Sequence, residues 1–220
     1  MSTLLDAPSD RPQPPVPKRP SLPNMRSAVQ ECRACDLWEG ATQGVMGEGA
    51  RNARLMLVGE QPGDREDIEG HPFLGPAGGV LDRGLERAGI ARDEVYVTNV
   101  VKHFRYKARG KRRIHQKPDR WHVSACAPWL EAELEMIRPD ALVCLGATAG
   151  QALLGPHVRI GRDRGRPIES DLAELVTLTT HPSAILRSQG EEQREAAMEQ
   201  FIADLAKVAA WLKRHAESKR

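Results

Sequence analysis

Short apolar runs alternate along this chain with segments of helical periodicity, and this alternation constrains the fold more than any other feature. Runs typical of buried strands lie at residues 54–58, 95–98, 141–145 and 175–179. Segments with helical spacing lie at residues 76–88, 118–137, 147–154 and 191–214. An alternating order of this kind predicts an α/β fold with a mainly parallel sheet and helices on both of its faces.

The amino-acid composition predicts where the folded region begins and ends. Residues 1–23 contain seven prolines and little to bury, so we expect a disordered Pro-rich tail, with a partner-recruitment motif as the alternative. The folded domain is expected at 24–214, followed by a polar tail at 215–220. Without a signal-peptide layout or an apolar run of roughly 18 residues, the chain is expected to be cytoplasmic and not to enter a membrane.

Polar residues follow the expected strands at the sheet edge where ligands bind in parallel α/β folds. Glu60 stands in a Gly-Glu-Gln-Pro-Gly turn after the first strand, where a solvated turn carboxylate is the alternative. Phe73 lies in a glycine- and proline-rich loop. Because only 4% of the chain is aromatic, we interpret Phe73 as a base-stacking residue as well as a candidate core residue.

Two further strand ends carry hydrogen-bonding side chains. Asn99 offers an amide donor beside an acceptor, which suits recognition of a base edge, although a strand-end cap is the simpler interpretation. His181 stands directly before Pro182 and Ser183 at the end of the fourth run. A histidine there can donate a hydrogen bond to an oxygen that gains negative charge, and a purely structural histidine is the alternative.

The polar insert after the second strand concentrates positive charge in a chain whose net charge is only +2. Between Lys102 and Arg120 there are nine Lys or Arg residues against one acid, with Phe104 and Tyr106 interleaved. This pattern indicates phosphate binding, and a solvated charged loop is the alternative. His115 lies inside the insert and could act as a base, a ligand or a nucleophile.

Four cysteines point to a metal or cluster site, because cytosolic thiols stay reduced and a disulfide framework is therefore unexpected. Cys32 and Cys35 form a C-x2-C pair, and Cys126 and Cys144 lie 18 positions apart. A structural zinc site usually has two such paired knuckles, and this chain has one. Cys144 lies within an expected strand and by itself would pass as a small core residue.

Together and in this order, these motifs resemble the iron–sulfur uracil-DNA glycosylases over about residues 30–214. The resemblance implies a three-layer α/β/α sandwich with a central four-stranded parallel sheet. It also implies a [4Fe–4S] cluster held by Cys32, Cys35, Cys126 and Cys144. The expected partner is uracil-containing DNA, in single strands or in duplex, bound by a monomer.

Gln61 and the Lys111-Arg112-Arg113-Ile114-His115 stretch resemble the DNA-crosslinking branch of this family, called UdgX. By this resemblance, uracil is excised and His115 then bonds to C1′ of the sugar, with Glu60 and His181 as the other catalytic residues. The remaining implied roles fall into two groups. Base recognition falls to Phe73, Asn99 and the backbone near Gln61, and contact with DNA to Lys111, Arg112, Arg113, Ser183 and Arg187.

Three other functions stay open at this stage. The nearest is a turnover glycosylase of the same fold in which His115 only contacts phosphate and a free abasic site is released. A non-catalytic DNA-binding protein whose cluster senses redox state would release no base. A zinc-stabilised nucleotide-binding module is disfavoured by the cysteine spacing.

Overall fold

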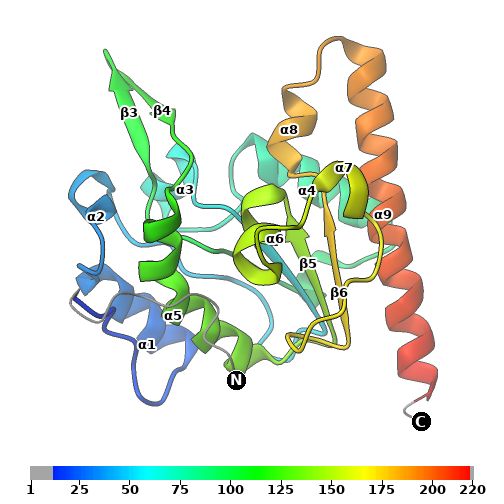
Figure 1. Ribbon diagram of the computed structural model, residues 1–220, viewed down its shortest axis with the longest axis horizontal. Coiled ribbons are helices and arrows are strands. Elements are labelled where there is room, and N and C mark those ends of the chain that lie inside the picture. The colour runs from blue at the N-terminus through cyan, green and yellow to red at the C-terminus, as the bar shows by residue number, and fades with distance from the viewer. Residues whose placement is uncertain (1–11, 219–220) are drawn as a thin grey trace.

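The computed structural model describes residues 12–218 and confirms the three-layer architecture (Figure 1). The central sheet has four parallel strands in the order β2-β1-β5-β6. Each strand is five residues long and buried throughout, which explains why the sequence shows continuous apolar runs at these places. The strands are β1 (Leu55–Gly59), β2 (Val95–Asn99), β5 (Ala141–Leu145) and β6 (Leu175–Thr179).

Alternating strand residues build a hydrophobic cluster on each face of the sheet. Met56 and Val58 belong to the cluster beneath one helical layer, and Leu55 and Leu57 belong to the other. The first layer consists of α1 (Leu22–Ala28), α5 (Arg120–Ile137) and α6 (Ala147–Leu154). The second consists of α4 (Pro76–Arg87), α8 (Pro182–Leu186) and α9 (Glu191–Ser218).

Several short elements escaped the sequence analysis because one or two helical turns do not establish a period. They are α2 (Leu37–Gly40), α3 (Asp64–Glu69), α7 (Ile160–Asp163) and the 3-10 turns at Val29–Glu31 and Arg92–Glu94. Across residues 12–218, none of the helices has the length and apolar character needed to cross a bilayer.

The polar insert forms an antiparallel hairpin that the sequence analysis did not predict. Strand β3 (Tyr106–Arg109) pairs with β4 (Arg112–His115) across a two-residue turn in which Gly110 has a φ of 59°. The hairpin projects from the body of the protein (Figure 1). Most of its side chains are solvent-exposed, so no apolar-polar alternation marks these strands in the sequence.

The folded region begins before residue 24, where the sequence analysis placed its start. Residues 1–11 of the predicted tail lie outside the described residues. Val16 and Leu22 pack against the core, and α1 begins at Leu22, with the Ser21 hydroxyl accepting a hydrogen bond from the Asn24 amide. Apolar contacts and a helix cap therefore hold part of the stretch that was expected to be disordered.

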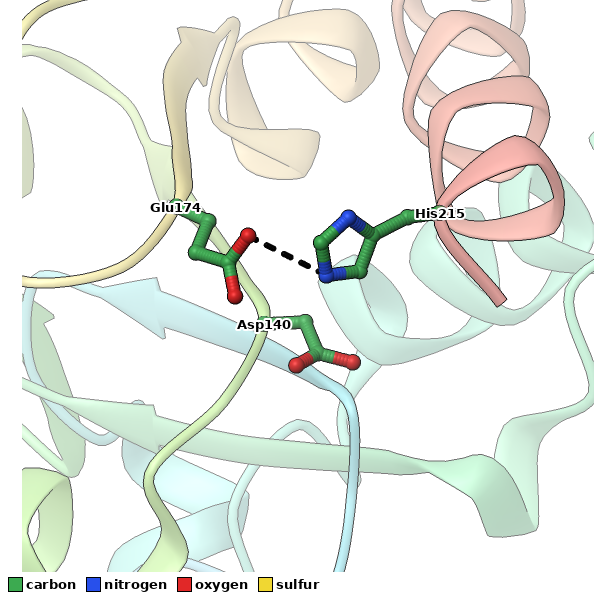
Figure 2. A group of neighbouring side chains, drawn as sticks. All are labelled: Asp140, Glu174 and His215. Atoms are coloured by element: carbon green, nitrogen blue, oxygen red, sulfur yellow. Dashed lines mark ion pairs between the residues drawn. The ribbon is translucent and has the colours of Figure 1, made fainter. Parts of the chain in front are cut away.

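The predicted polar C-terminal tail continues α9 as far as Ser218. His215 points from this helix toward Glu174, with its Nε2 at 3.1 Å from Glu174 Oε2 (Figure 2). Arg54 pairs with Asp140 beside them at 2.5 Å and donates a hydrogen bond to the Leu212 carbonyl oxygen. These polar contacts join the end of α9 to the amino-terminal edge of the sheet, opposite the edge where ligands are expected.

A buried ion pair lies directly behind the end of β2. Lys102 Nζ and Glu133 Oε2 are 2.6 Å apart, and both side chains are 0% exposed. The ammonium also donates to Thr98 Oγ1 and to the Asn99 carbonyl oxygen, each at 2.7 Å. Glu133 accepts a further hydrogen bond from the Tyr96 hydroxyl. Lys102 was counted with the phosphate-binding cations of the insert, and the structure instead makes it part of the core.

We predict that Glu133→Gln strongly destabilises the protein, because it leaves the Lys102 ammonium buried without a counterion. The expected loss is about 3–5 kcal/mol, measured from urea unfolding midpoints. Glu199→Gln is the matched control, since it breaks the exposed pair with Arg87 and should cost about 0–1 kcal/mol. Equal shifts for the two variants would contradict this account of the core.

Candidate active site

The carboxyl ends of the four strands bring together residues that are far apart in the sequence. Glu60 follows β1, Asn99 ends β2, and His181 follows β6. Gly59 makes this convergence possible. A Cβ atom there would lie 2.4 Å from Asn99 Oδ1 and 2.7 Å from Phe73 Cζ, so only glycine lets these two side chains approach β1.

Phe73 is presented to the strand ends by a constrained loop. Its φ of 57° lies in the left-handed region that non-glycine residues rarely adopt. Glu66 holds the loop by accepting a hydrogen bond from the Gly75 amide at 2.8 Å, and a Cβ at Gly78 would collide with the Phe73 carbonyl oxygen. The Phe73 and His181 ring centroids are 6.2 Å apart. The strained backbone thus places an aromatic face beside the predicted catalytic histidine.

His181 is held in one tautomer. The Ser183 backbone N–H donates to His181 Nδ1 at 3.1 Å, so in the neutral ring the proton is on Nε2. Burial lowers the pKa of His181 to about 4, although the carboxylate of Glu60 acts in the opposite direction. At neutral pH this histidine is therefore a neutral hydrogen-bond donor, which is what stabilisation of a developing oxyanion requires.

Glu60 has a partner on each of its two oxygens. Oε1 lies 3.3 Å from His115 Nε2, and Oε2 accepts a hydrogen bond from the Thr148 hydroxyl. Burial alone would raise the pKa of Glu60. The hydrogen bonds with His115 and Thr148, together with the charges of His115 and His181, bring it below its ordinary value. The site therefore holds an ionised carboxylate against an imidazole.

Thr148 was missed by the sequence analysis, which found no chemistry at the end of β5. It lies in the first turn of α6, and a single threonine at the start of a helix gives no sequence signal beyond a helix-forming context. Only the folded chain brings its hydroxyl to Glu60.

Gln61 ties the base of the hairpin to the strand ends. Its side-chain amide donates to the carbonyl oxygens of Arg105 and Gln116 at 3.1 Å and accepts from the Arg105 amide at 3.1 Å. The sequence analysis assigned Gln61 to base recognition. That role was expected of the backbone near Gln61 and stays a prediction, while the side chain holds both ends of the hairpin that carries His115.

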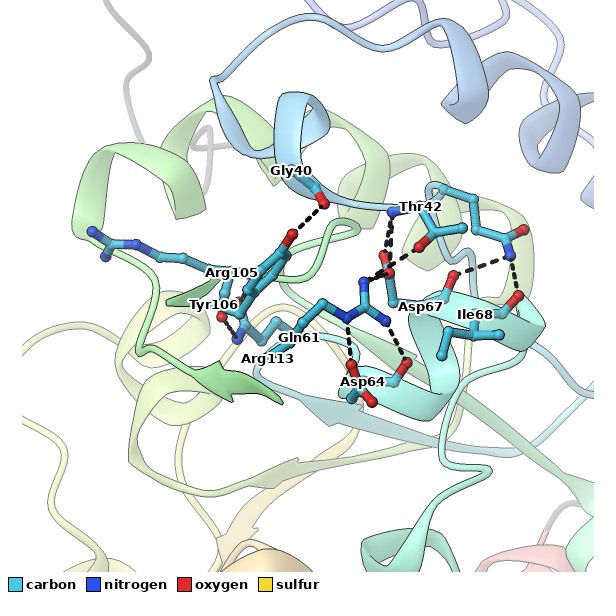
Figure 3. A network of polar contacts seen from close by, with 10 residues as sticks. Gly40, Thr42, Gln61, Asp64, Asp67, Ile68, Arg105, Tyr106 and Arg113 are labelled. Atoms are coloured by element: carbon cyan, nitrogen blue, oxygen red, sulfur yellow. Dashed lines mark hydrogen bonds and ion pairs between the residues drawn. The ribbon is translucent and has the colours of Figure 1, made fainter. Parts of the chain in front are cut away.

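Arg113 anchors the hairpin to α3 (Figure 3). Its guanidinium pairs with Asp64 at 2.5 Å and with the buried Asp67 at 2.6 Å. The same group lies over the Tyr106 and Phe104 rings, 5.2 and 5.5 Å from their centroids. Arg113 was expected to contact DNA, which stays a prediction; in the structure it makes four hydrogen bonds, to Asp64, Asp67 and Thr42, and these contacts position the hairpin.

Other predicted DNA-contact residues differ in exposure. Lys111 and Arg112 are exposed at the turn of the hairpin. Arg187 is exposed beside the pocket and donates to Ser183 Oγ at 3.1 Å. Ser183 in turn contacts His181 Nδ1 through both its amide and its hydroxyl, so its contacts orient the histidine. Lys111, Arg112 and Arg187 are therefore accessible cations that could meet phosphates.

Three of the four cysteines gather on one side of α5. The Lys102 amide donates to Cys126 Sγ at 3.2 Å, and the Trp129 indole N–H donates to Cys32 Sγ at 3.4 Å. Burial raises the pKa of Cys35 to about 11 and that of Cys126 to about 12, and the neighbouring cysteines add to both shifts. Buried thiols that receive N–H hydrogen bonds fit an iron–sulfur site, in which the metal keeps the sulfur deprotonated.

Cys144 is not among these three cysteines. It lies on β5 between Val58 and Leu178, so strand β1 separates it from β2 and its backbone is roughly 10 Å from that strand. Burial alone raises the pKa of Cys144 to about 12. His103, in contrast, directly follows the amide that donates to Cys126, is 4% exposed, and interacts electrostatically with Arg33, which lies between Cys32 and Cys35. His103 is therefore a second candidate, beside Cys144, for the fourth position next to these three cysteines.

Comparison with known proteins gives a consistent result. Residues 46–206 match the model of the uracil DNA glycosylase superfamily. A type-4 uracil-DNA glycosylase of Thermotoga maritima is 38% identical over 187 residues, covering 84% of this chain and 92% of the relative. Type-4 enzymes of Pyrobaculum aerophilum and Archaeoglobus fulgidus are 32% and 35% identical, each over 80% of this chain and over 92% and 89% of their own lengths. This chain belongs to the uracil DNA glycosylase superfamily.

Proposed function

We propose that this protein excises uracil from DNA and then becomes covalently attached to the deoxyribose through His115. The observation that carries the proposal is the 3.3 Å approach of His115 Nε2 to Glu60 Oε1 at the strand ends, beside Asn99, Phe73 and His181. The names of the type-4 relatives support the excision step. The attachment step rests on the position of His115.

Recognition begins with a uracil nucleotide turned out of the base stack, which a weak base pair or a single strand makes less costly. Uracil stacks on Phe73, and the Asn99 amide pairs with N3–H and O4. Cytosine presents the reverse donor and acceptor pattern at these positions, so a fixed amide disfavours it. The exposed Lys111, Arg112 and Arg187 neutralise the flanking phosphates.

Cleavage of the N-glycosidic bond moves an electron pair onto uracil and leaves positive charge at C1′. Neutral His181 donates a hydrogen bond from Nε2 to uracil O2 as that oxygen becomes negative. The ionised Glu60 carboxylate stabilises the oxocarbenium-like sugar. Because burial lowers the pKa of His181, the ring stays neutral and its Nε2 donor is unchanged throughout the neutral pH range.

His115 then captures the sugar in place of water. Glu60 accepts the Nε2 proton of His115, and the freed electron pair forms a bond from Nε2 to C1′. Glu60 passes this proton to solvent, and the uracil anion takes up one proton, so the overall change is exchange of uracil for imidazole at C1′. Turnover stops at this point, because the adduct contains no leaving group comparable to uracil.

We further propose that Cys32, Cys35 and Cys126 hold a [4Fe–4S] cluster, with His103 as the fourth ligand. The hydrogen bonds to two of the three sulfurs and the position of His103 support this set. The cluster would brace the chain that follows β2, since Lys102 contacts Cys126 through its amide and Asn99 through its ammonium.

We predict that the wild-type protein forms a crosslink with uracil-containing single-stranded DNA. After incubation and boiling, a denaturing gel should show a protein–DNA species. His115→Ala should abolish this species because the nucleophile is lost, and His157→Ala should retain it, since His157 is exposed and lies outside the site. Release of a free abasic strand by the wild type would instead identify a turnover glycosylase. An absence of base release would favour the non-catalytic redox-sensing alternative.

We predict different defects for two adjacent arginines. Arg113→Gln should reduce crosslinks per uracil excised by roughly 100-fold, because displacement of the hairpin by about 1 Å misaligns the nucleophile. Arg112→Gln should leave this ratio unchanged while weakening DNA binding and reducing the slope of log affinity against log salt by about one. If Arg113→Gln changed only the salt dependence, Arg113 would be a DNA contact, as the sequence analysis expected.

We predict that His103→Ala loses iron and that Cys144→Ala keeps it. Iron per chain and the visible absorbance of the purified protein report this directly, without any activity measurement. Cys126→Ala serves as the positive control for loss of the cluster. Iron loss in Cys144→Ala with retention in His103→Ala would restore the four-cysteine ligand set.

A further inference from the structure

Thr148 reaches the site from an element that is neither the hairpin nor one of the segments that carry the sequence motifs. It belongs to α6, which begins immediately after the end of β5. Gly146, with a φ of 92°, makes the turn between them, and a Cβ there would lie only 2.9 Å from His181 Cβ. This close turn brings the first residues of α6 against both His181 and the carboxylate of Glu60.

The two oxygens of Glu60 are held by two different parts of the fold. Oε1 meets His115 from the hairpin, and Oε2 meets Thr148 from α6. The titratable groups that act on Glu60 are His115 and His181. A hydroxyl that donates to one oxygen leaves the carboxylate little freedom to rotate, and it thereby directs the other oxygen at the nucleophile.

We propose that Thr148 is a positioning residue whose hydroxyl orients Glu60 toward His115 and keeps this carboxylate ionised for the covalent step. The inference rests on the proposed function, in which Glu60 accepts the Nε2 proton and stabilises the sugar cation. Both tasks require an anion with Oε1 facing the imidazole. Without the hydroxyl, the carboxylate is free to turn away, and its burial favours the neutral acid.

The substitution Thr148→Val tests this role because it replaces the hydroxyl with a methyl group of similar size. Hydrogen bonds to charged groups are strong enough that their loss should reduce crosslinks per uracil excised by roughly tenfold or more. Thr148→Ser keeps the hydroxyl and should stay within about twofold of wild type. Thr177→Val is the matched control, since it makes the same change at a buried hydroxyl without a hydrogen-bond partner, away from the site.

The pH dependence of uracil release distinguishes a specific effect of Thr148 on Glu60 from a general disturbance of the protein structure. The Thr148 hydrogen bond lowers the pKa of Glu60, so its removal raises that pKa, and the anion is then lost at a higher pH as the solution is acidified. The acid limb of single-turnover release should therefore move to higher pH in Thr148→Val but not in Thr148→Ser or Thr177→Val. Overlapping profiles and an unchanged crosslink ratio in Thr148→Val would overturn the inference.

A substrate-free measurement distinguishes failure of this inference from failure of the proposed function. The Glu60 carboxyl can be titrated by NMR in protein labelled with 13C-glutamate, with Glu60→Gln to assign its signal. A higher pKa in Thr148→Val supports the contact even if the wild type forms no crosslink. A wild type that crosslinks, combined with an unchanged Glu60 titration, leaves the proposed function intact and refutes the role of Thr148.

Discussion

The buried pair between Lys102 and Glu133 fixes the part of the chain on which the site depends. The Lys102 ammonium donates a hydrogen bond to the Asn99 carbonyl oxygen, and the Lys102 backbone amide donates one to Cys126 Sγ. Removing either charge would leave the other buried without a counterion, so the segment after β2 has one strongly favoured conformation. A single electrostatic constraint therefore connects the end of β2, which carries Asn99, with the region of the three cysteines.

The connection that follows β1 contributes two neighbouring residues to the candidate site. Glu60 supplies the carboxylate, and the next residue, Gln61, closes the base of the hairpin through its side-chain amide. Farther along, Asp64 and Asp67 in α3 hold Arg113 on the hairpin itself. His115 and the Glu60 carboxylate are thus both held by the same short stretch of chain, which keeps their separation small although His115 lies on an exposed strand.

Sequence patterns predicted the sheet and the larger helices because continuous apolar runs and helical periods reflect burial directly. They also singled out Glu60, Asn99 and His181, since strand ends in parallel sheets converge, and His115 because it lies in the basic insert. They gave no sign of contacts that depend on a partner rather than on a pattern, as for the side chains of Gln61, Arg113 and Thr148. Lys102 was counted as a phosphate-binding cation because nothing in a basic run marks the member whose partner is a buried carboxylate 31 positions away. For Cys144 the residue type suggests a ligand, whereas the buried position on β5 is equally typical of a core residue.

The proposed attachment can be understood as a competition between imidazole and water for one sugar cation. A nucleophile held at a fixed distance has an effective concentration of about 10⁵–10⁸ M, far above that of any solvent molecule. The hairpin contacts of Gln61 and Arg113 supply this fixed distance, and the Thr148–Glu60–His115 sequence of contacts supplies the direction. The same rigidity that favours capture also prevents release, because water would need to displace a tethered imidazole from the position it already occupies. A change from crosslinking to turnover therefore requires loss of the nucleophile or loss of its anchorage, whereas the groups that bind and activate uracil can remain unchanged.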